Sequence, residues 1–353
     1  MTRTRIAVVG CGHLGAIHAR LLAAREDAEL VAVCDPIIDA RERVAAAQNC
    51  RALAEPRELP GLVDAAVVAA PTGLHAGVAL PLLEAGVDLL VEKPIAATVE
   101  DARAISVAAR RCGRVVAVGH VERFNPAWRA AVERAPGATM VEAVRAAPFT
   151  FRSLDVGVIH DLMIHDIDLV LSLEPGRLER VEAQGILATG GFEDAARARL
   201  VFSSGLVADL SASRISPQLR RTVSMWSPQG IVHADLNAKT VEAITPSDGV
   251  RQGTFVAADV SAPERAALKD RFFSDVLPLQ SVTVADVNAI ACEHDDFLAS
   301  IRTARQPLVT AAAGAAAVEI AARVIEALQC VRLGSTGPQR PATIPIQPRR
   351  RTG

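Results

Sequence analysis

Tyrosine is absent from this chain of 353 residues. The absence excludes the tyrosine–lysine proton relay on which short-chain dehydrogenases and aldo-keto reductases depend. If the chain works with a nicotinamide cofactor, histidine, lysine or a carboxylate must therefore serve as its acid or base.

Other features are missing as well. The six scattered cysteines form no C-x-x-C pair, so we predict neither a metal site nor a disulfide framework; reduced, mostly buried thiols fit a cytoplasmic protein. We expect no signal peptide before the first strand-like segment, and no apolar run is long enough to span a bilayer. A net charge of −2 and a pI near 6.5 argue against nucleic acid or an anionic membrane as a partner.

Lysine is scarce, since only three of the 38 basic residues are lysine: Lys93, Lys239 and Lys269. A remaining lysine is a candidate for a role that arginine cannot fill, because an ammonium loses its proton when desolvated and a guanidinium does not. Lys93 follows an apolar run that predicts a buried strand, so it falls at the carboxyl end of that strand, where open α/β sheets bind their ligands. The alternative is an ordinary surface lysine, which is our interpretation of the other two.

The length predicts two domains, and the first half predicts an α/β fold. Residues 1–122 alternate short apolar runs with helical patterns, which indicates an amino-terminal Rossmann domain with a doubly wound parallel sheet. The predicted strands are residues 5–9, 30–34, 65–70, 88–91 and 115–119, and the predicted helices are residues 13–24, 77–85 and 99–111.

The pattern changes after residue 122. Two hairpin signals, at residues 203–205 and 227–230, predict a carboxy-terminal α/β domain over residues 123–333 with an open, mainly antiparallel sheet. Helices are predicted at residues 161–173, 287–301 and 310–328, and packing of the last one back on the first domain is left open. Residues 334–353, rich in proline and arginine, predict a flexible tail.

A glycine fingerprint lies between the first predicted strand and the first predicted helix: Gly10, Gly12 and Gly15, with His13 and Leu14 between them. Asp35 follows Gly15 by twenty residues, at the end of the next strand, where a carboxylate can bind an adenosine ribose. The alternative is a strand–turn–helix without a ligand. Asp35 would repel a 2′-phosphate, which favours NAD over NADP unless Arg41 or Arg43 turns toward the ribose.

A polar stripe follows one face of the predicted helix at residues 161–173. Asp161, His165, Asp168 and Ser172 are spaced i, i+4, i+7 and i+11, and the other positions are largely apolar. His165 titrates near neutral pH when unperturbed, and Asp161, one turn away, is a possible partner for it. The alternative is a structural histidine with Asp166 and Asp168 facing water. Asp155 and His160 form a second pair just upstream.

Together these motifs resemble the Gfo/Idh/MocA oxidoreductase family over residues 4–330. The motifs that carry this resemblance are the glycine fingerprint, the loop Ala70-Pro71-Thr72-x-x-His75, Glu92-Lys93-Pro94 and Asp161-x-x-x-His165-x-x-Asp168. The resemblance implies catalysis by Lys93, His165 and Asp161, with a peptide bond before Pro94 that is often cis in the family. The implied cofactor-binding residues are Gly10, Gly12, His13, Leu14, Gly15, Asp35, Ala70, Pro71, Thr72, His75, Glu92 and Lys93.

The segment 119–126 and the helix at 161–173 are similar to those of the branch that oxidises the 3-hydroxyl of UDP-N-acetylglucosamine. This similarity implies substrate contacts by Lys93, Arg123, Asn125, Asp161 and His165, although Arg123 and Asn125 have the alternative role of bracing the hinge between the domains. Two further alternatives are a dehydrogenase of a free sugar or inositol and a non-catalytic NAD-binding sensor. The open sheet predicts a homodimer or homotetramer.

Overall fold

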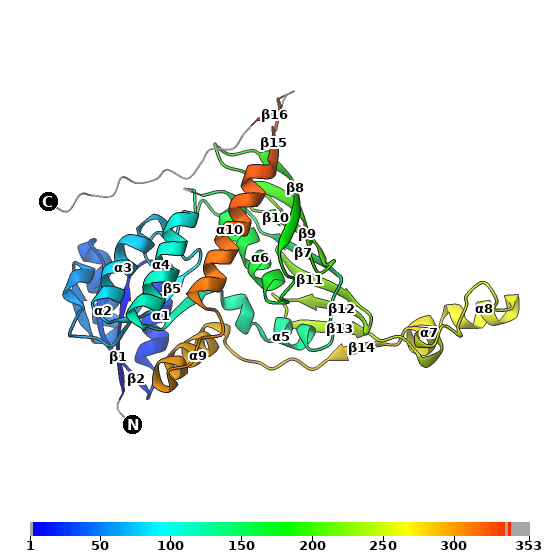
Figure 1. The fold of residues 1–353 in the computed structure, drawn as a ribbon, viewed down its shortest axis with the longest axis horizontal. Helices are drawn as coiled ribbons and strands as arrows, with labels where there is room; N and C mark the ends of the chain where they lie inside the picture. The colour runs from blue at the N-terminus through cyan, green and yellow to red at the C-terminus, as the bar shows by residue number, and fades with distance from the viewer. Residues whose placement is uncertain (1–2, 155, 336–337, 340–353) are drawn as a thin grey trace.

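The computed structural model describes residues 3–154, 156–335 and 338–339, and it contains two sheets with helices between and around them (Figure 1). We call the parallel sheet and its helices the first lobe and the larger sheet with its helices the second lobe. Asp155 and most of the tail for which we predicted flexibility lie outside the described residues. Within the described residues no helix is both long and apolar enough to cross a membrane.

The first lobe is built on a six-stranded parallel sheet in the order β3-β2-β1-β4-β5-β6. The strands β4, β5 and β6 are buried at every position, as expected where helices cover both faces, whereas the edge strand β3 has no buried residue. The prediction missed β3 and α2, because β3 is short and the α2 segment has little apolar periodicity. The strands are β1 (Thr4–Val9), β2 (Ala28–Cys34), β3 (Arg51–Leu53), β4 (Ala65–Val68), β5 (Asp88–Glu92) and β6 (Val116–Gly119), and the helices are α1 (His13–Ala23), α2 (Ile38–Gln48), α3 (His75–Glu84) and α4 (Val99–Cys112).

The carboxyl ends of these strands bring most of the predicted cofactor residues to one edge of the first lobe. Gly10 follows β1, Asp35 follows β2, Ala70 comes shortly after β4 and Lys93 follows β5. Parallel strands all end at the same edge, and the strand order reverses between β1 and β4. Ligands of doubly wound folds bind at such a reversal.

The second lobe is a ten-stranded mixed sheet in the order β14-β13-β12-β11-β7-β10-β9-β8-β15-β16. Both predicted hairpins are confirmed as antiparallel pairs, β9 with β10 and β11 with β12. Buried and half-exposed residues alternate along β10, so one face of the sheet is packed and the other is open. The strands are β7 (Met140–Ala146), β8 (Leu178–Leu187), β9 (Ala195–Phe202), β10 (Val207–Ser213), β11 (Arg220–Ser227), β12 (Gly230–Asp235), β13 (Thr240–Ile244), β14 (Leu279–Val282), β15 (Leu328–Arg332) and β16 (Pro338–Gln339).

The helix predicted at residues 161–173 begins as a π-helical turn, Ile159–Met163, and continues as α6 (Ile164–Leu171). A π turn adds a residue, so the expected spacing of Asp161 and His165 along one α-helical face does not hold there. The sequence did not predict the projecting arm between β13 and β14, which carries the short helices α7 (Asp248–Arg251) and α8 (Ala262–Lys269) (Figure 1).

Three further helices connect the lobes or cover the second sheet. Helix α5 (Pro126–Val132) packs on β12 and β13, and α9 (Ala289–Thr303) returns to the first lobe beside α1. Helix α10 (Ala311–Ala327) contacts α4 in the first lobe as well as α6 and β8 in the second (Figure 1). The approach is close, because a Cβ on Gly314 would lie 2.7 Å from a side-chain carbon of Val118.

Candidate active site

The turn after β1 has the backbone that a pyrophosphate site requires. Gly10 has φ +97°, and a Cβ there would lie 2.5 Å from the carbonyl oxygen of Ala69. A Cβ on Gly15 would lie 1.8 Å from the Gly10 oxygen, so this glycine lets α1 pack against the turn. Gly12 has open space in front of it and precedes the amino terminus of α1, where backbone N–H groups favour an anion. These residues fit a dinucleotide.

Asp35 braces this turn with both of its oxygens. Its Oδ2 accepts a hydrogen bond from Cys11 N at 2.8 Å, and its Oδ1 accepts one from Ile37 N at 2.9 Å. An ionised carboxylate keeps further lone pairs, so Asp35 can still accept from a ribose hydroxyl. Arg41 donates to the Asp35 carbonyl and Arg43 to the Cys11 carbonyl, so both guanidinium groups are held at the backbone of this turn.

The loop after β4 is tied to the segment that carries Lys93. The ring nitrogens of buried His75 lie 2.9 Å from the Pro94 carbonyl oxygen and 2.8 Å from that of Ala70. His75 thus holds two loops together from behind, whereas Pro71 and Thr72 lie nearer to solvent at the sheet edge. The Lys93–Pro94 peptide bond is cis, as the resemblance implied.

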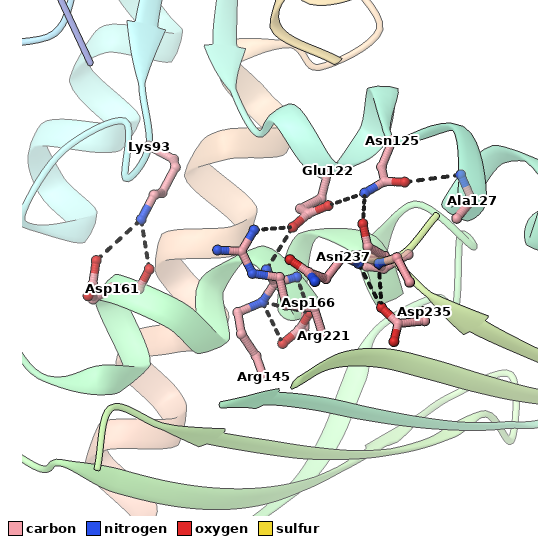
Figure 2. A network of polar contacts seen from close by, with 12 residues as sticks. Lys93, Glu122, Asn125, Ala127, Arg145, Asp161, Asp166, Arg221, Asp235 and Asn237 are labelled. Carbon is pink, nitrogen blue, oxygen red and sulfur yellow. Dashed lines mark hydrogen bonds and ion pairs between the residues drawn. The ribbon is translucent and has the colours of Figure 1, made fainter. Parts of the chain in front are cut away.

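Lys93 extends from the first lobe to the π turn of the second (Figure 2). Its Nζ donates to the Asp161 carbonyl oxygen at 2.7 Å and lies 3.6 Å from Asp161 Oδ1. The side chain is 14% exposed. Burial lowers the pKa of Lys93, while the charges of Asp161 and Glu92 oppose that shift. An ammonium in such surroundings can bind a substrate oxygen strongly, since little water screens it.

His165 lies close enough for the charge of Lys93 to act on it. Burial and then Lys93 hold the pKa of His165 well below its usual value, so the imidazole is neutral at neutral pH. Its Nδ1 is buried and has no hydrogen-bond partner in the described residues. The expected Asp161–His165 pair does not form there: the π turn directs the Asp161 carboxylate to Lys93 instead. A neutral, partly exposed imidazole can accept a proton.

Two more histidines surround Lys93. His160, on the same π turn, is buried, and burial followed by the Lys93 charge lowers its pKa to about 4. His120, which follows β6, meets the ring of His165 edge to face with centroids 6.4 Å apart. Both histidines are buried more deeply than His165, which makes His165 the better placed of the three to meet a substrate.

A buried ion network supports the helix that carries His165 (Figure 2). Arg145 Nη1 donates to Glu122 Oε1 at 2.7 Å, and its Nη2 donates to Asp166 Oδ1 at 2.7 Å. Nothing in the sequence marks Arg145 as part of the site, because it lies on β7, more than twenty residues from Asp166 and from Glu122. The structural alternative for His165 requires Asp166 and Asp168 to face water. Both side chains are instead buried, with exposed fractions of 2% and 1%.

Arg123 and Asn125 brace the junction between the lobes. Arg123 Nε donates to Asp168 Oδ2 at 2.8 Å. Asn125 is buried: its amide nitrogen donates to Glu122 and to the Leu236 carbonyl, and its oxygen accepts from Ala127 N. These bonds occupy the polar atoms of Asn125, so the bracing role fits it better than the expected substrate contact.

Glu92 also differs from the expectation that it binds the cofactor. Its carboxylate is directed into the first lobe, where Oε1 lies 2.7 Å from His18 Nε2 on α1. Its Oε2 accepts from the Lys93 backbone N–H at 3.2 Å. The E-K-P motif therefore places two neighbouring side chains on opposite sides of the strand end, Lys93 toward the second lobe and Glu92 inward.

Both lobes of the chain are similar to known proteins. Residues 4–120 match the oxidoreductase family with an NAD-binding Rossmann fold, and residues 107–232 match the GFO/IDH/MocA C-terminal domain. The UDP-N-acetylglucosamine 3-dehydrogenase of Acidithiobacillus ferrooxidans is 33% identical over 93% of this chain and 100% of its own length.

A solved structure of that Acidithiobacillus ferrooxidans enzyme has a TM-score of 0.81 and 32% identity, covering 93% of this chain and 98% of its own. The NAD(+)-dependent scyllo-inositol 2-dehydrogenase of Bacillus subtilis is 30% identical over 61% of this chain and 68% of its own length. With its NAD-binding Rossmann domain and mixed-sheet second lobe, the chain belongs to the Gfo/Idh/MocA family of oxidoreductases.

Proposed function

We propose that this protein oxidises a sugar hydroxyl to a ketone. Its proposed substrate is a UDP-linked N-acetylamino sugar such as UDP-N-acetylglucosamine, which it oxidises at the 3-hydroxyl. The observation that carries the proposal is the approach of the Lys93 ammonium to the turn before His165, at the edge where the cofactor residues gather. The relative that acts on UDP-N-acetylglucosamine is similar along its whole length, whereas the inositol enzyme matches 61% of this chain.

The residues of the site divide the chemistry between the two lobes. Bound NAD supplies the acceptor for the hydride that leaves the hydroxyl-bearing carbon. His165, held neutral, accepts the hydroxyl proton as the carbon–oxygen double bond forms. Lys93 donates a hydrogen bond to that oxygen and stabilises the negative charge that develops on it. Asp161 holds the Lys93 ammonium from the other side rather than orienting His165.

The cofactor residues follow from the geometry of the first lobe. Gly12 and the amino terminus of α1 would hold the pyrophosphate, and Asp35 would hold the adenosine ribose. Thr72 lies on the loop after β4 at the same edge and would line the nicotinamide end. His75 and Glu92 would support the site from behind, since both side chains are buried.

Arg221 supports a substrate with negative charge. It pairs across the sheet with Arg145 at the start of β11, and its side chain is 44% exposed. Burial is the largest cause of the lowered pKa of His165, and the charge of Arg221 adds to it, so this guanidinium lies near the site. Arg221 also lies 3.9 Å from buried Glu122, and its half-exposed guanidinium can in addition bind the diphosphate of a nucleotide sugar.

A dehydrogenase of a free sugar or inositol is the second candidate, favoured by the similarity to the inositol enzyme. NADH formation, followed by absorbance, separates the two when NAD is supplied with UDP-N-acetylglucosamine, N-acetylglucosamine or an inositol in turn. The proposal expects turnover only with the nucleotide sugar. Turnover with inositol and none with the nucleotide sugar would replace it with the second candidate.

We also propose that two or four copies associate through the open face of the ten-stranded sheet. On that face Arg199 Nε donates to Asp209 Oδ1 at 2.7 Å, between half-exposed apolar and polar neighbours. Large open sheet faces are commonly covered by a partner. Light scattering at micromolar concentration should give a dimer or tetramer, and a monomer would contradict this proposal.

A further inference from the structure

Behind Lys93 the first lobe contains a buried cluster of four side chains: His18 on α1, Glu92 on β5, and Glu293 and His294 on α9. His18 Nε2 lies 2.7 Å from Glu92 Oε1, and His18 Nδ1 lies 2.8 Å from His294 Nε2. An ionised carboxylate only accepts hydrogen bonds, so Nε2 of His18 donates to Glu92, and Nδ1 of a neutral His18 accepts from His294. The chain of contacts runs from α9 through α1 to the strand that carries Lys93.

Glu293 is the unusual member of this cluster. It is 2% exposed, and neither carboxylate oxygen has a hydrogen-bond partner in the described residues. Burial, then the charge of Glu92, raises the pKa of Glu293 well above its usual value. One ligand atom each of His18, Glu92 and Glu293 lie within 4.8 Å of one another, so Glu293 faces the other two groups. A buried carboxyl without a cation is far cheaper as the neutral acid.

Glu92 stays ionised beside this acid. Burial alone would raise its pKa, but His18 and Lys93 together lower it. Gly119 on the neighbouring strand leaves room for this carboxylate, because a Cβ there would lie 2.9 Å from Glu92 Oε2. The same oxygen accepts from the Lys93 N–H at 3.2 Å. Two carboxyl groups this close together in the interior favour a state in which one carries a proton and the other is ionised.

We propose that Glu92, held by His18 and facing Glu293, is a positioning residue that fixes the backbone of Lys93 and keeps its side chain charged. This inference rests on the proposed role of Lys93 at the substrate oxygen. The cluster holds one negative charge behind the lysine, and His18 links that charge to α1, whose amino terminus would hold the pyrophosphate of the cofactor.

A divalent cation is the alternative occupant of this cluster, since His and two Glu are metal-ligating types. The geometry favours the proton. A tetrahedral site with bonds of roughly 2.1 Å needs its ligand atoms roughly 3.4 Å apart, whereas His18 Nε2 and Glu92 Oε1 are at the hydrogen-bond distance of 2.7 Å. Metal analysis of the purified protein is therefore part of the test.

The scarcity of lysine makes the inference measurable without turnover. Protein labelled at the lysine ε-carbon gives three NMR signals, and Lys239 and Lys269 serve as internal references for the titration of Lys93. The other charged or titratable groups around Lys93 are Asp161, Arg145, His120, His160 and His165. Those groups stay unchanged in the variants below.

Glu92→Gln keeps the shape of the side chain and removes its charge, so the pKa of Lys93 should fall by about one pH unit. Glu293→Gln imitates a neutral acid and should leave that pKa unchanged. Asp88→Asn is the matched control, because Asp88 is a buried carboxylate at the opposite end of β5 that accepts from Val115 N. It should also leave Lys93 unchanged.

An unchanged Lys93 titration in Glu92→Gln would overturn the inference, and so would a shift in Glu293→Gln equal to that in Glu92→Gln. One equivalent of bound metal ion in the purified protein, lost in Glu293→Gln, would also overturn it, because a cation would then take the place of the proton on Glu293. If Glu92→Gln does not fold, Glu293→Gln and metal analysis still decide the question. Failure of the proposed function itself would show differently, as full turnover in Lys93→Ala.

Discussion

The buried carboxyl groups behind Lys93 and the arginine-paired carboxylates of the second lobe are stabilised in different ways. In the second lobe Glu122 and Asp166 share the Arg145 guanidinium, and Asp194 meets Arg214 at 2.8 Å. In the first lobe Glu92 meets an imidazole and Glu293 meets no cation in the described residues. Arginine stays charged across the pH range of proteins, whereas imidazole and carboxyl groups exchange protons. The second lobe thus gives a fixed frame for His165, and the first gives Lys93 a proton-bearing support.

The largest effect should come from the two side chains that meet between the lobes. Lys93→Ala and His165→Ala should each lower kcat by about a hundred- to ten-thousand-fold, because each removes a group that acts on the reacting oxygen. Steady-state kinetics measures the loss, and calorimetry should give unchanged NAD affinity. Lys239→Ala, an exposed lysine beside Asp286, should keep full activity. Near-normal turnover in either active-site variant would remove that residue from the mechanism.

Breaking the fixed frame should cost stability. Arg145→Met leaves Glu122 and Asp166 buried without their cation, so unfolding free energy should fall by about 3–5 kcal/mol. Denaturant titration measures the change. The exposed pair Arg199–Asp209 supplies the control, since Arg199→Met should cost less than about 1 kcal/mol in the monomer. An equal loss of unfolding free energy in the two variants would mean that the buried network contributes no more to stability than the exposed ion pair.

Substrate charge sharpens the comparison at the sheet. Arg221→Gln should raise KM for the nucleotide sugar about tenfold with little change in kcat, because one diphosphate contact is lost. Arg220→Gln is the matched control, since neighbouring strand residues point to opposite faces. Similar KM values in both variants would mean that Arg221 does not contact the substrate.

The smallest expected effect is in the pH dependence, where His165 of the second lobe sets the acid limb and Lys93 of the first lobe sets the alkaline limb. His165 acts in its neutral form, and its pKa lies well below 6.5, so kcat/KM should stay level as the pH falls through 6.5. Lys93 acts in its charged form, and burial lowers its pKa from 10.5, so the alkaline loss should begin below that value. A pH–rate profile measures both limbs. An acid limb at or above pH 6.5 would contradict a base whose pKa lies well below its usual value.

Local patterns in the sequence predicted the parts of the site that depend on chain-local geometry. Gly10, Gly12 and Asp35 were found because a strand, a turn and a helix follow one another there. Lys93 was found because strands of a parallel sheet end at a common edge. The composition also drew attention to Lys93, because nearly all other basic residues of the chain are arginine.

Other parts of the site depend on contacts between distant segments, which a single sequence does not reveal. Glu92 and His18 are 74 residues apart, and His18 and His294 are 276 apart. The pairing of Asp161 with Lys93 rather than His165 depends on one π turn, which apolar periodicity does not distinguish from an α-helix. Helix spacing alone therefore assigned Asp161 the wrong neighbour.

The double variant Lys93→Ala/His165→Ala tests most directly whether one residue from each lobe acts on a single oxygen. When two groups act as a unit, removing the second costs little once the first is gone. The kcat of the double variant should therefore lie within about tenfold of the kcat of the slower single variant. Losses that multiply in full would contradict the account, because they would mean that Lys93 and His165 act independently at different atoms.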